Sequence, residues 1–401
     1  MLPSSSRMKV RIKAILATLC CISAMHALEV SRPFASHMVL PHDVEIPLHG
    51  KARAGAMISV RFDDTLLTTT SQSDGSWRVT LPAIPPSASA RSLKIASGDQ
   101  KIVLEDVLVG EVWLCSGQSN MDFPLQRATG GKVEGKRPEN PTIRFFSLTG
   151  LATSPQPFRE SDHERLKPEN FFQGNWQKDG SPLRGNLSAV AWWFAQQRQL
   201  DTNMPIGIVE NAVGGSGTEA WLSQQVLQSR AEYADFLTTK WLDHPKVSAW
   251  AKQRARQQTS QWKNFPHPFQ PGFLYQSGIA WWRDFPFTAA IWYQGETNAE
   301  MADIEWNSRL LEDLMSGWRE GLRHPTLPFF IVELPRIGGN DPLRQYWPQY
   351  RKAQQKAVAN TPHAYRIVTM DLGWDSPDVH PPDKKPLALR VAAEVKRQLR
   401  R

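Results

Sequence analysis

The sequence predicts an α/β protein with a doubly wound, mostly parallel sheet, preceded by a β-sandwich domain. After residue 119, short apolar runs of strand length alternate with helical patterns, which is typical of a parallel sheet covered by helices on both faces. From Leu28 to about Asp106, apolar residues instead recur at every second position between turn signals, as in antiparallel sheets. The length of 401 residues also favours two domains over one core.

The first 27 residues have the pattern of a secretory signal peptide. A basic region precedes an apolar stretch, Ala14 to Met25, that is too short to span a bilayer comfortably, and Ala27 offers a small residue for cleavage. The alternative is an uncleaved membrane anchor. A lipoprotein is disfavoured, because Leu19 before Cys20 is large for such a cleavage site. We therefore expect a secreted or periplasmic protein with no stable membrane association after cleavage.

Cleavage at this point would change both the charge and the cysteine content. The removed segment contains four basic residues and no acidic ones, so the net charge would fall from +8 to +4. A mildly basic protein is not a nucleic-acid binder on charge alone. Cys115 would be the one remaining cysteine, so no intramolecular disulfide could form, and we expect it to be a buried apolar residue.

The predicted β-sandwich domain covers residues 28–106. Alternating apolar residues predict one strand over 58–62 and another over 77–81, and Asp74-Gly75 is predicted to form a tight hairpin turn between strand-like runs. Proline-rich breaks such as Ile84-Pro85-Pro86 separate further short strands.

The second predicted domain covers residues 107–401 and supplies the parallel sheet. Ser188 is a candidate cap for a helix over 189–200, and further helical faces lie within 304–318 and 387–395. Residues 222–285 are irregular and rich in aromatic side chains, and we interpret them as an insertion that shapes the rim of a cleft. The predicted strands cover residues 107–114, 205–209, 288–293, 327–332 and 365–370.

A polar turn follows the end of several of these strands. These turns are Gly117-Gln118-Ser119-Asn120-Met121, Glu210 to Gly217, Gln294 to Asn298, and Asp371 to Pro381. In parallel sheets the carboxyl ends of the strands meet at one crevice. A serine, a glycine pair, amide side chains and a histidine beside acids are the groups that serine acyl transfer requires.

These motifs resemble those of the sialate O-acetylesterase family, within the SGNH-type serine esterases. The similarity extends in the family's order over nearly the whole mature chain. The similar stretches are Gly110 to Met121, Gly214-Gly215 with Glu219-Ala220-Trp221, Ile291 to Asn298, and Asp378-Val379-His380-Pro381-Pro382, with weaker similarity at Phe34 to Pro41 and Leu327 to Phe330.

The resemblance implies a role for each candidate residue. It implies that Ser119 is the nucleophile and His380 the general base. The backbone N–H of Ser119, a glycine at Gly215 or Gly214, and the side chain of Gln294 would bind the oxyanion. Asn298 is a further candidate for this substrate-binding group, although we expect Asn298 and its neighbour Glu296 mainly to brace their turn.

The carboxylate that orients His380 is the open assignment. Related esterases often have an aspartate three residues before the histidine, where this chain has Pro377. Asp378 matches the Asp-x-His-Pro pattern of the sialate esterase group and is our choice. Asp375 and a backbone carbonyl are the alternatives. Two other acids near these motifs, Asp122 and Glu219, are expected to be structural.

The expected function is that of a carbohydrate O-acetylesterase, with an acetylated carbohydrate as partner and no cofactor. The sequence contains no His-Glu-x-x-His motif and no paired cysteine ligands, so no metal site is predicted. The first alternative is a glycoside hydrolase using Glu296 with Asp375. The second is a non-catalytic secreted carbohydrate-binding protein. No pattern specifies the sugar, the acetyl position or the oligomeric state.

Overall fold

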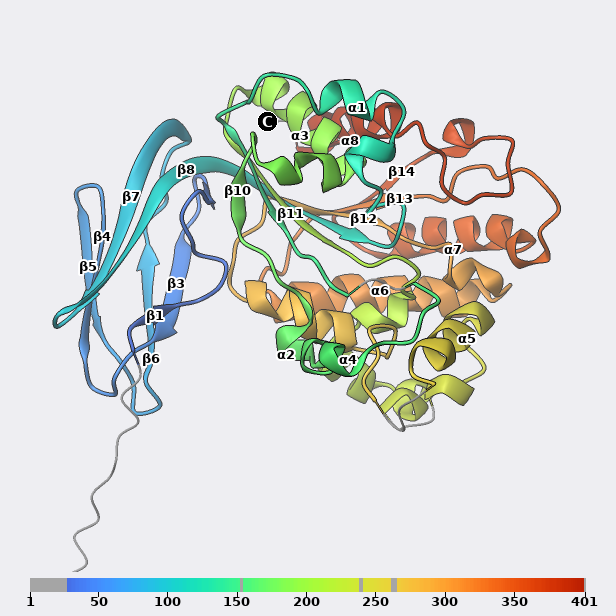
Figure 1. Ribbon diagram of the computed structural model, residues 1–401, viewed down its shortest axis with the longest axis horizontal. Coiled ribbons are helices and arrows are strands. Elements are labelled where there is room, and N and C mark those ends of the chain that lie inside the picture. Colours follow the sequence, from blue (N-terminus) through green and yellow to red (C-terminus); the bar gives the residue numbers. More distant parts are fainter. Residues whose placement is uncertain (1–26, 152–153, 238–240, 261–264, 400–401) are drawn as a thin grey trace, which may run out of the picture.

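The computed structural model describes residues 27–151, 154–237, 241–260 and 265–399, and it has a mixed α/β fold. An N-terminal β unit lies on one side of the molecule, beside a larger part in which helices flank a sheet (Figure 1). The predicted α/β class is therefore confirmed. The predicted signal peptide falls on residues outside the described ranges, apart from Ala27. In these ranges, no helix combines the length and apolar character needed to cross a membrane.

The strands cover Glu29–Val30 (β1), Val39–Pro41 (β2), Ile46–Lys51 (β3), Met57–Phe62 (β4), Thr65–Thr70 (β5), Ser76–Leu81 (β6), Ser87–Ser97 (β7), Gln100–Gly117 (β8), Ile143–Ser147 (β9), Trp176–Lys178 (β10), Ile206–Ala212 (β11), Ala289–Tyr293 (β12), Phe329–Val332 (β13) and Ala364–Ile367 (β14). The α-helices cover Gly131–Glu134 (α1), Pro168–Phe171 (α2), Ala189–Thr202 (α3), Gln224–Ser229 (α4), Ala249–Gln258 (α5), Ile304–Gly321 (α6), Trp347–Asn360 (α7) and Lys385–Leu399 (α8).

The sheet of the larger part has the strand order β10-β9-β11-β8-β12-β13-β14. All neighbouring pairs from β9 to β14 are parallel, and β10 joins the edge in the antiparallel direction. The five strands predicted from apolar runs are β8, β11, β12, β13 and β14. No strand was predicted at the positions of β9 and β10.

Side chains of this sheet alternate between two hydrophobic cores. Trp113 and Cys115 pack in one core with α3 and α8, whereas Val112 and Leu114 pack in the other with α6. Figure 1 shows the same arrangement, with α3 and α8 on one side of the sheet and α6 and α7 on the other. Both faces of the strands are thus covered, which explains why their sequences are continuously apolar.

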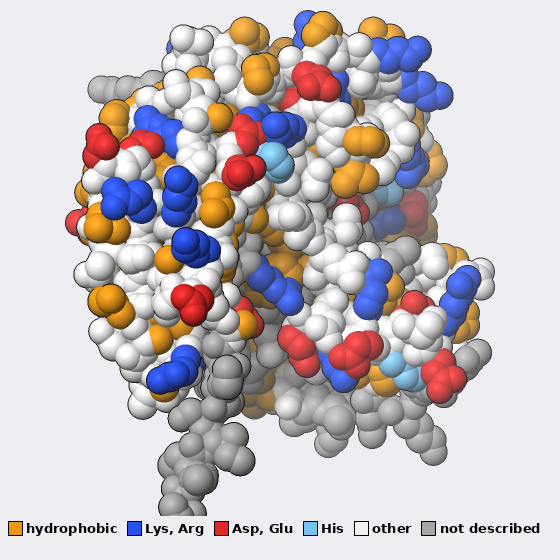
Figure 2. All heavy atoms as spheres, turned by 60° about the vertical axis from the view of Figure 1, so that its left-hand side comes forward, with side chains coloured by type: hydrophobic (Ala, Val, Ile, Leu, Met, Phe, Trp, Pro, Cys, Tyr) orange, Lys and Arg blue, Asp and Glu red, His pale blue; other side chains and the backbone are white. Residues whose placement is uncertain are grey.

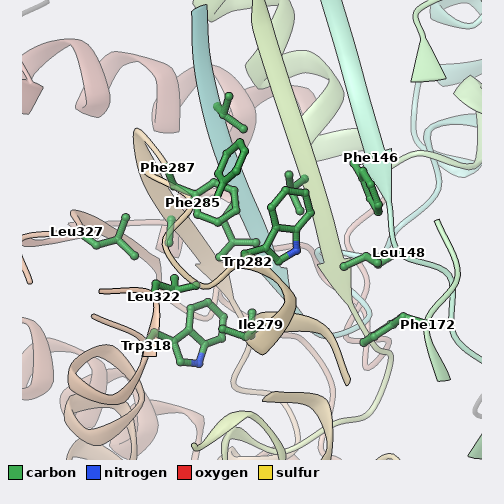
Figure 3. Close-up of a cluster of buried hydrophobic side chains, with 14 of the residues drawn as sticks. Phe146, Leu148, Phe172, Ile279, Trp282, Phe285, Phe287, Trp318, Leu322 and Leu327 are labelled. Atoms are coloured by element: carbon green, nitrogen blue, oxygen red, sulfur yellow. The ribbon is translucent and has the colours of Figure 1, made fainter. Parts of the chain in front are cut away.

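The core on the α6 side of the sheet contains a dense group of aromatic residues. Trp282 lies between Phe146 of β9 and Phe285, with ring centroids 5.2 Å from each (Figure 3). Trp318 of α6 closes the group from the helix side. Ile279, Trp282 and Phe285, near the end of the predicted aromatic insertion, are therefore core residues. Most of the tryptophan side chains are likewise buried in the packing.

Two predicted helix boundaries have visible physical causes. The Ser188 hydroxyl accepts a hydrogen bond from the Ala191 N–H, so the predicted cap at the start of α3 is confirmed. Asp303 caps α6 in the same way through the Trp306 N–H.

The predicted strand over 365–370 is shorter than expected, since β14 ends at Ile367, and Val368 and Met370 are exposed.

The N-terminal unit contains two groups of paired strands. β1, β3 and β6 form one sheet. In the other group β5 pairs with β4, β4 pairs with β7, and β7 pairs with the first part of β8. The predicted hairpin at Asp74-Gly75 is wrong. Gly75 does form a tight turn with a φ of 78°, but β5 pairs with β4 and β6 pairs with β3, so the turn connects two different sheets.

The 18-residue strand β8 joins the two parts of the molecule. Its first half pairs with β7, and its second half lies between β11 and β12. The predicted domain boundary at residues 106 and 107 falls within this strand, and it remains a prediction. Asp106, at this point, has a positive φ of 56°.

On the face seen in Figure 2, basic and acidic side chains are interspersed with apolar ones.

Candidate active site

The serine turn begins where β8 ends. Gly117 has a φ of 145°, and a Cβ there would lie 2.0 Å from the Tyr293 carbonyl oxygen, so only glycine fits this close approach of β8 and β12. The Gln118 carbonyl then accepts hydrogen bonds from the N–H groups of Met121 and Asp122, both at 2.9 Å. Ser119 lies at the top of this turn and is partly exposed, whereas its two neighbours are buried.

His380 lies directly against this serine. Its Nε2 is 2.8 Å from Ser119 Oγ, and its Nδ1 is 2.7 Å from the Asp378 carboxylate. An ionised carboxylate can only accept hydrogen bonds, so Nδ1 donates to Asp378 and Nε2 is the acceptor for the serine hydroxyl. The three side chains therefore form a continuous hydrogen-bonded chain, although Ser119 and His380 lie 261 positions apart in sequence.

Asp375, the alternative partner of His380, points elsewhere. Its side chain is 91% exposed and lies 3.8 Å from Arg336. Asp378, by contrast, accepts from the backbone N–H as well as the ring of His380. The distances therefore favour Asp378 over both Asp375 and a backbone carbonyl. Of the two carboxyl groups that the glycoside hydrolase hypothesis needs at one bond, Glu296 lines the cleft around Ser119, whereas Asp375 is not among the described residues that line it.

A cleft of about 420 Å³ surrounds Ser119 and His380. Gly214 and Gly215, from the turn after β11, lie in its wall. Trp250 of α5 also lines it, so residues 222–285 do contribute to the rim, as expected. Within the described residues, the backbone N–H groups of Ser119 and Gly215 donate no hydrogen bond to the protein, and they are available to a bound oxygen.

Gln294 and Asn298 lie below the cleft rather than in its wall. Both are buried, and the Gln294 amide donates to Asn298 at 2.7 Å and to Gln118 at 3.2 Å. Asn298 also donates to Glu219 at 3.0 Å, and burial raises the pKa of that glutamate. This network braces the turn after β12 against the serine turn. In this arrangement the Gln294 amide is not directed at the cleft.

Asn120 and Lys384 complete the site, and the sequence did not identify either. Asn120 donates to the Val379 carbonyl at 2.8 Å and also to Glu296, while the Lys384 ammonium donates to Asn120. Burial lowers the pKa of Lys384 to about 7, and burial raises that of Glu296. Val379 precedes His380, so this contact holds the histidine loop against the serine turn.

Nothing in the local sequence indicated that Lys384, four residues after His380, would be buried against Asn120. Of the acids expected to be structural, Glu219 belongs to the buried network described above.

Cys115 is buried, and burial raises the pKa of its thiol. Within the described residues, no group of three or more His, Cys, Asp or Glu is placed to hold a metal ion.

Comparison with known proteins agrees with this site. A family model described as "Carbohydrate esterase, sialic acid-specific acetylesterase" matches residues 253–390, which include Asp378 and His380. Curated sialate O-acetylesterases from mouse and human are 23% and 27% identical to this chain over 358 and 307 residues. The chain is therefore similar to sialate O-acetylesterases.

The matches to these relatives are partial in length. The mouse alignment covers 81% of this chain and 63% of the mouse protein, and the human alignment covers 72% and 53%. A solved structure of a novel carbohydrate acetylesterase from Xanthomonas citri is 27% identical, with a TM-score of 0.72 over 92% of this chain and 75% of that one. The chain therefore shares its fold with that acetylesterase.

Proposed function

We propose that this protein is a carbohydrate O-acetylesterase that removes acetyl groups from sugar hydroxyls through an acyl-serine intermediate. The observation that supports this most is the hydrogen-bonded chain from Ser119 through His380 to Asp378 in the wall of a cleft. The similarity to sialate O-acetylesterases and the structural similarity to a carbohydrate acetylesterase support it. Acetylated glycans, including acetylated sialic acids, are the proposed substrates.

The proposed reaction begins with attack of Ser119 Oγ on the acetyl carbonyl carbon while His380 Nε2 accepts the serine proton. The negative charge that develops on the carbonyl oxygen is stabilised by the free N–H groups of Ser119 and Gly215. Gly214 beside them is a further candidate. Gln294 remains a predicted third donor, although its amide would have to turn away from Asn298 to reach the oxygen.

Collapse of this intermediate breaks the ester bond. His380 gives its proton to the departing sugar oxygen, which leaves as a hydroxyl group, and the acetyl group stays on Ser119. A water molecule then attacks the acyl-serine, His380 takes the water proton, and acetate leaves as the proton returns to Ser119 Oγ. Asp378 keeps the imidazole in the tautomer that both halves require and stabilises the transient imidazolium.

Replacement of the nucleophile tests this proposal. Ser119→Ala should lower kcat for acetate release by at least about 10³-fold, because no acyl-enzyme can form. The assay measures acetate from acetylated sialic acid, acetylated xylan and an aryl acetate, with Ser89→Ala, an exposed serine of β7, as the control. Undiminished turnover in folded Ser119→Ala would refute the mechanism, and release of reducing ends without acetate would support the hydrolase alternative instead.

We further propose the finer architecture that the sequence suggested. In this view, residues 107–401 form a doubly wound SGNH-type domain, residues 28–106 form a β-sandwich, and residues 222–285 are an insertion. The helices on both faces of the parallel strands support the first part. The basic and apolar pattern of residues 1–27 supports secretion or export to a periplasm.

A further inference from the structure

A second cavity, of about 360 Å³, adjoins the catalytic cleft. Gly214 lies in the wall of both, so the glycine turn after β11 is their common boundary. Asp122, three residues beyond Ser119, lines the second cavity from the serine side. The opposite wall comes from residues 147–151 after β9 and residues 173–177 at β10. A ligand held at Ser119 can therefore extend past Gly214 into this space.

The wall of this cavity is polar but contains a single ionisable side chain. It presents hydroxyl groups from Ser147 and Thr149 and amide groups from Gln177 and Asn175, together with leucine side chains. No lysine or arginine is among the described residues that line it. Amides and hydroxyls both donate and accept hydrogen bonds, which suits the hydroxyl groups and apolar C–H faces of a sugar.

Asp122 is an acceptor in this wall that no described residue uses. Its side chain is exposed at the cavity and accepts no hydrogen bond within the described residues. The protein atoms around the carboxyl group exclude part of the solvent, and this desolvation raises its pKa to about 7.

The neighbouring Glu210 differs from Asp122 in this respect, because its two oxygens are already occupied. They accept from the Ser188 N–H at 3.0 Å and the Ser147 hydroxyl at 3.1 Å. Asp122 is therefore the carboxyl group of this pair that can accept from a bound ligand.

We propose that the second cavity binds an uncharged sugar unit next to the acetylated one, with Asp122 accepting from its hydroxyl groups. The enzyme would then prefer acetylated oligosaccharides to acetylated monosaccharides. This inference rests on the proposed esterase function. The sugar unit in this cavity is neutral, because an anionic group would face the Asp122 carboxyl group with no lysine or arginine among the described wall residues to balance it.

The experiment compares kcat/KM for acetate release from O-acetylated xylotriose and from an acetylated methyl xyloside. In the wild type, we expect the trisaccharide to exceed the monosaccharide by about tenfold, which corresponds to about 1.4 kcal/mol of added binding. Asp122→Ala should lower this ratio by about fivefold or more. Gln177→Ala, on the opposite wall, should lower it as well, and Asp99→Ala, in the exposed turn between β7 and β8, is the matched control.

The outcomes separate this inference from the proposed function. A wild-type ratio near one, or a ratio that both cavity variants leave unchanged, would overturn the inference while acetate release still supports the esterase. If the wild type releases no acetate from any ester, the proposed function fails. Calorimetric binding of unacetylated xylotriose, lost in Asp122→Ala, would then still support the cavity. Equally tight binding of a trisaccharide with a carboxylate in each unit would overturn the charge argument.

Discussion

At the scale of single residues, the site depends on which polar atoms are already used by the protein. Asp378 Oδ1 accepts from the backbone N–H and the ring of His380, whereas Gln294 and Asn298 are hydrogen-bonded to each other below the cleft. Ser119 and Gly215 have unused N–H groups in the cleft wall. The distribution of free and occupied donors therefore distinguishes groups that can contact substrate from groups that hold the turns.

Replacement of Asp378 tests its contact with the imidazole. Asp378→Asn keeps the shape of the side chain, but an amide can donate to Nδ1 and so stabilise the tautomer that cannot accept the serine proton. We expect kcat/KM for an aryl acetate to fall by about 10²-fold or more. Asp375→Asn is the control, with a change below about twofold. Equal losses in the two variants would contradict the assignment of Asp378.

At the scale of the elements, the site is fixed by contacts between strand ends and helix starts. Glu210, near the end of β11, accepts from the N–H of Ser188, the residue that caps α3. Asn120 and Lys384 similarly connect the turn after β8 with the start of α8. These buried polar contacts fix the positions of the loops, because an apolar core alone does not determine the orientation of a turn.

Glu210 makes the stability of the fold depend on pH. Burial, with a smaller contribution from the Asp122 charge, raises the pKa of Glu210 to about 8, against about 4.5 in the unfolded chain. Below pH 4.5 the carboxyl group is protonated in both states. As the pH rises from 4.5 to 8, only the unfolded chain loses the proton, so stability falls.

Glu210→Gln should reduce this loss of stability between pH 5 and pH 8 by on the order of 1–3 kcal/mol. The measurement is the free energy of unfolding in urea at several pH values, with exposed Glu105→Gln as the control. If the wild type and the Glu210 variant have parallel pH profiles, the proton on Glu210 is not linked to folding.

At the scale of the whole molecule, the N-terminal unit and the larger part share one core. Phe34 of the N-terminal unit lies 6.0 Å from Phe285, and both belong to the same buried cluster as Trp282. Arg78 of β6 also pairs with Asp284 at 2.5 Å. Together with the continuous strand β8, these contacts predict that the two parts unfold together.

We expect calorimetry to show a single cooperative transition with equal calorimetric and van't Hoff enthalpies. Phe34→Ala should destabilise this one transition by about 3 kcal/mol, because it leaves a cavity in the shared core. Two resolved transitions, of which only one moves in Phe34→Ala, would show instead that the parts are independent.

The sequence alone indicated β8, β11, β12, β13 and β14 and the helices α3, α6 and α8, in their order. Continuous apolar runs indicated the buried strands, Ser188 indicated the start of α3, and the turn motifs placed Ser119 and His380 beyond the carboxyl ends of strands in one sheet. Such features depend on local patterning, because each strand or helix must bury one side or both, and each helix start must satisfy its free N–H groups.

Only the tertiary structure decided which polar groups meet. It brought Asp378 rather than Asp375 to His380, buried Gln294 beneath the cleft, placed Lys384 against Asn120, and paired β6 with β3. The physical reason is that hydrogen bonds and charge interactions act over a few ångströms. Whether two such groups lie within that distance depends on how loops from distant parts of the chain pack, and local sequence does not encode that packing.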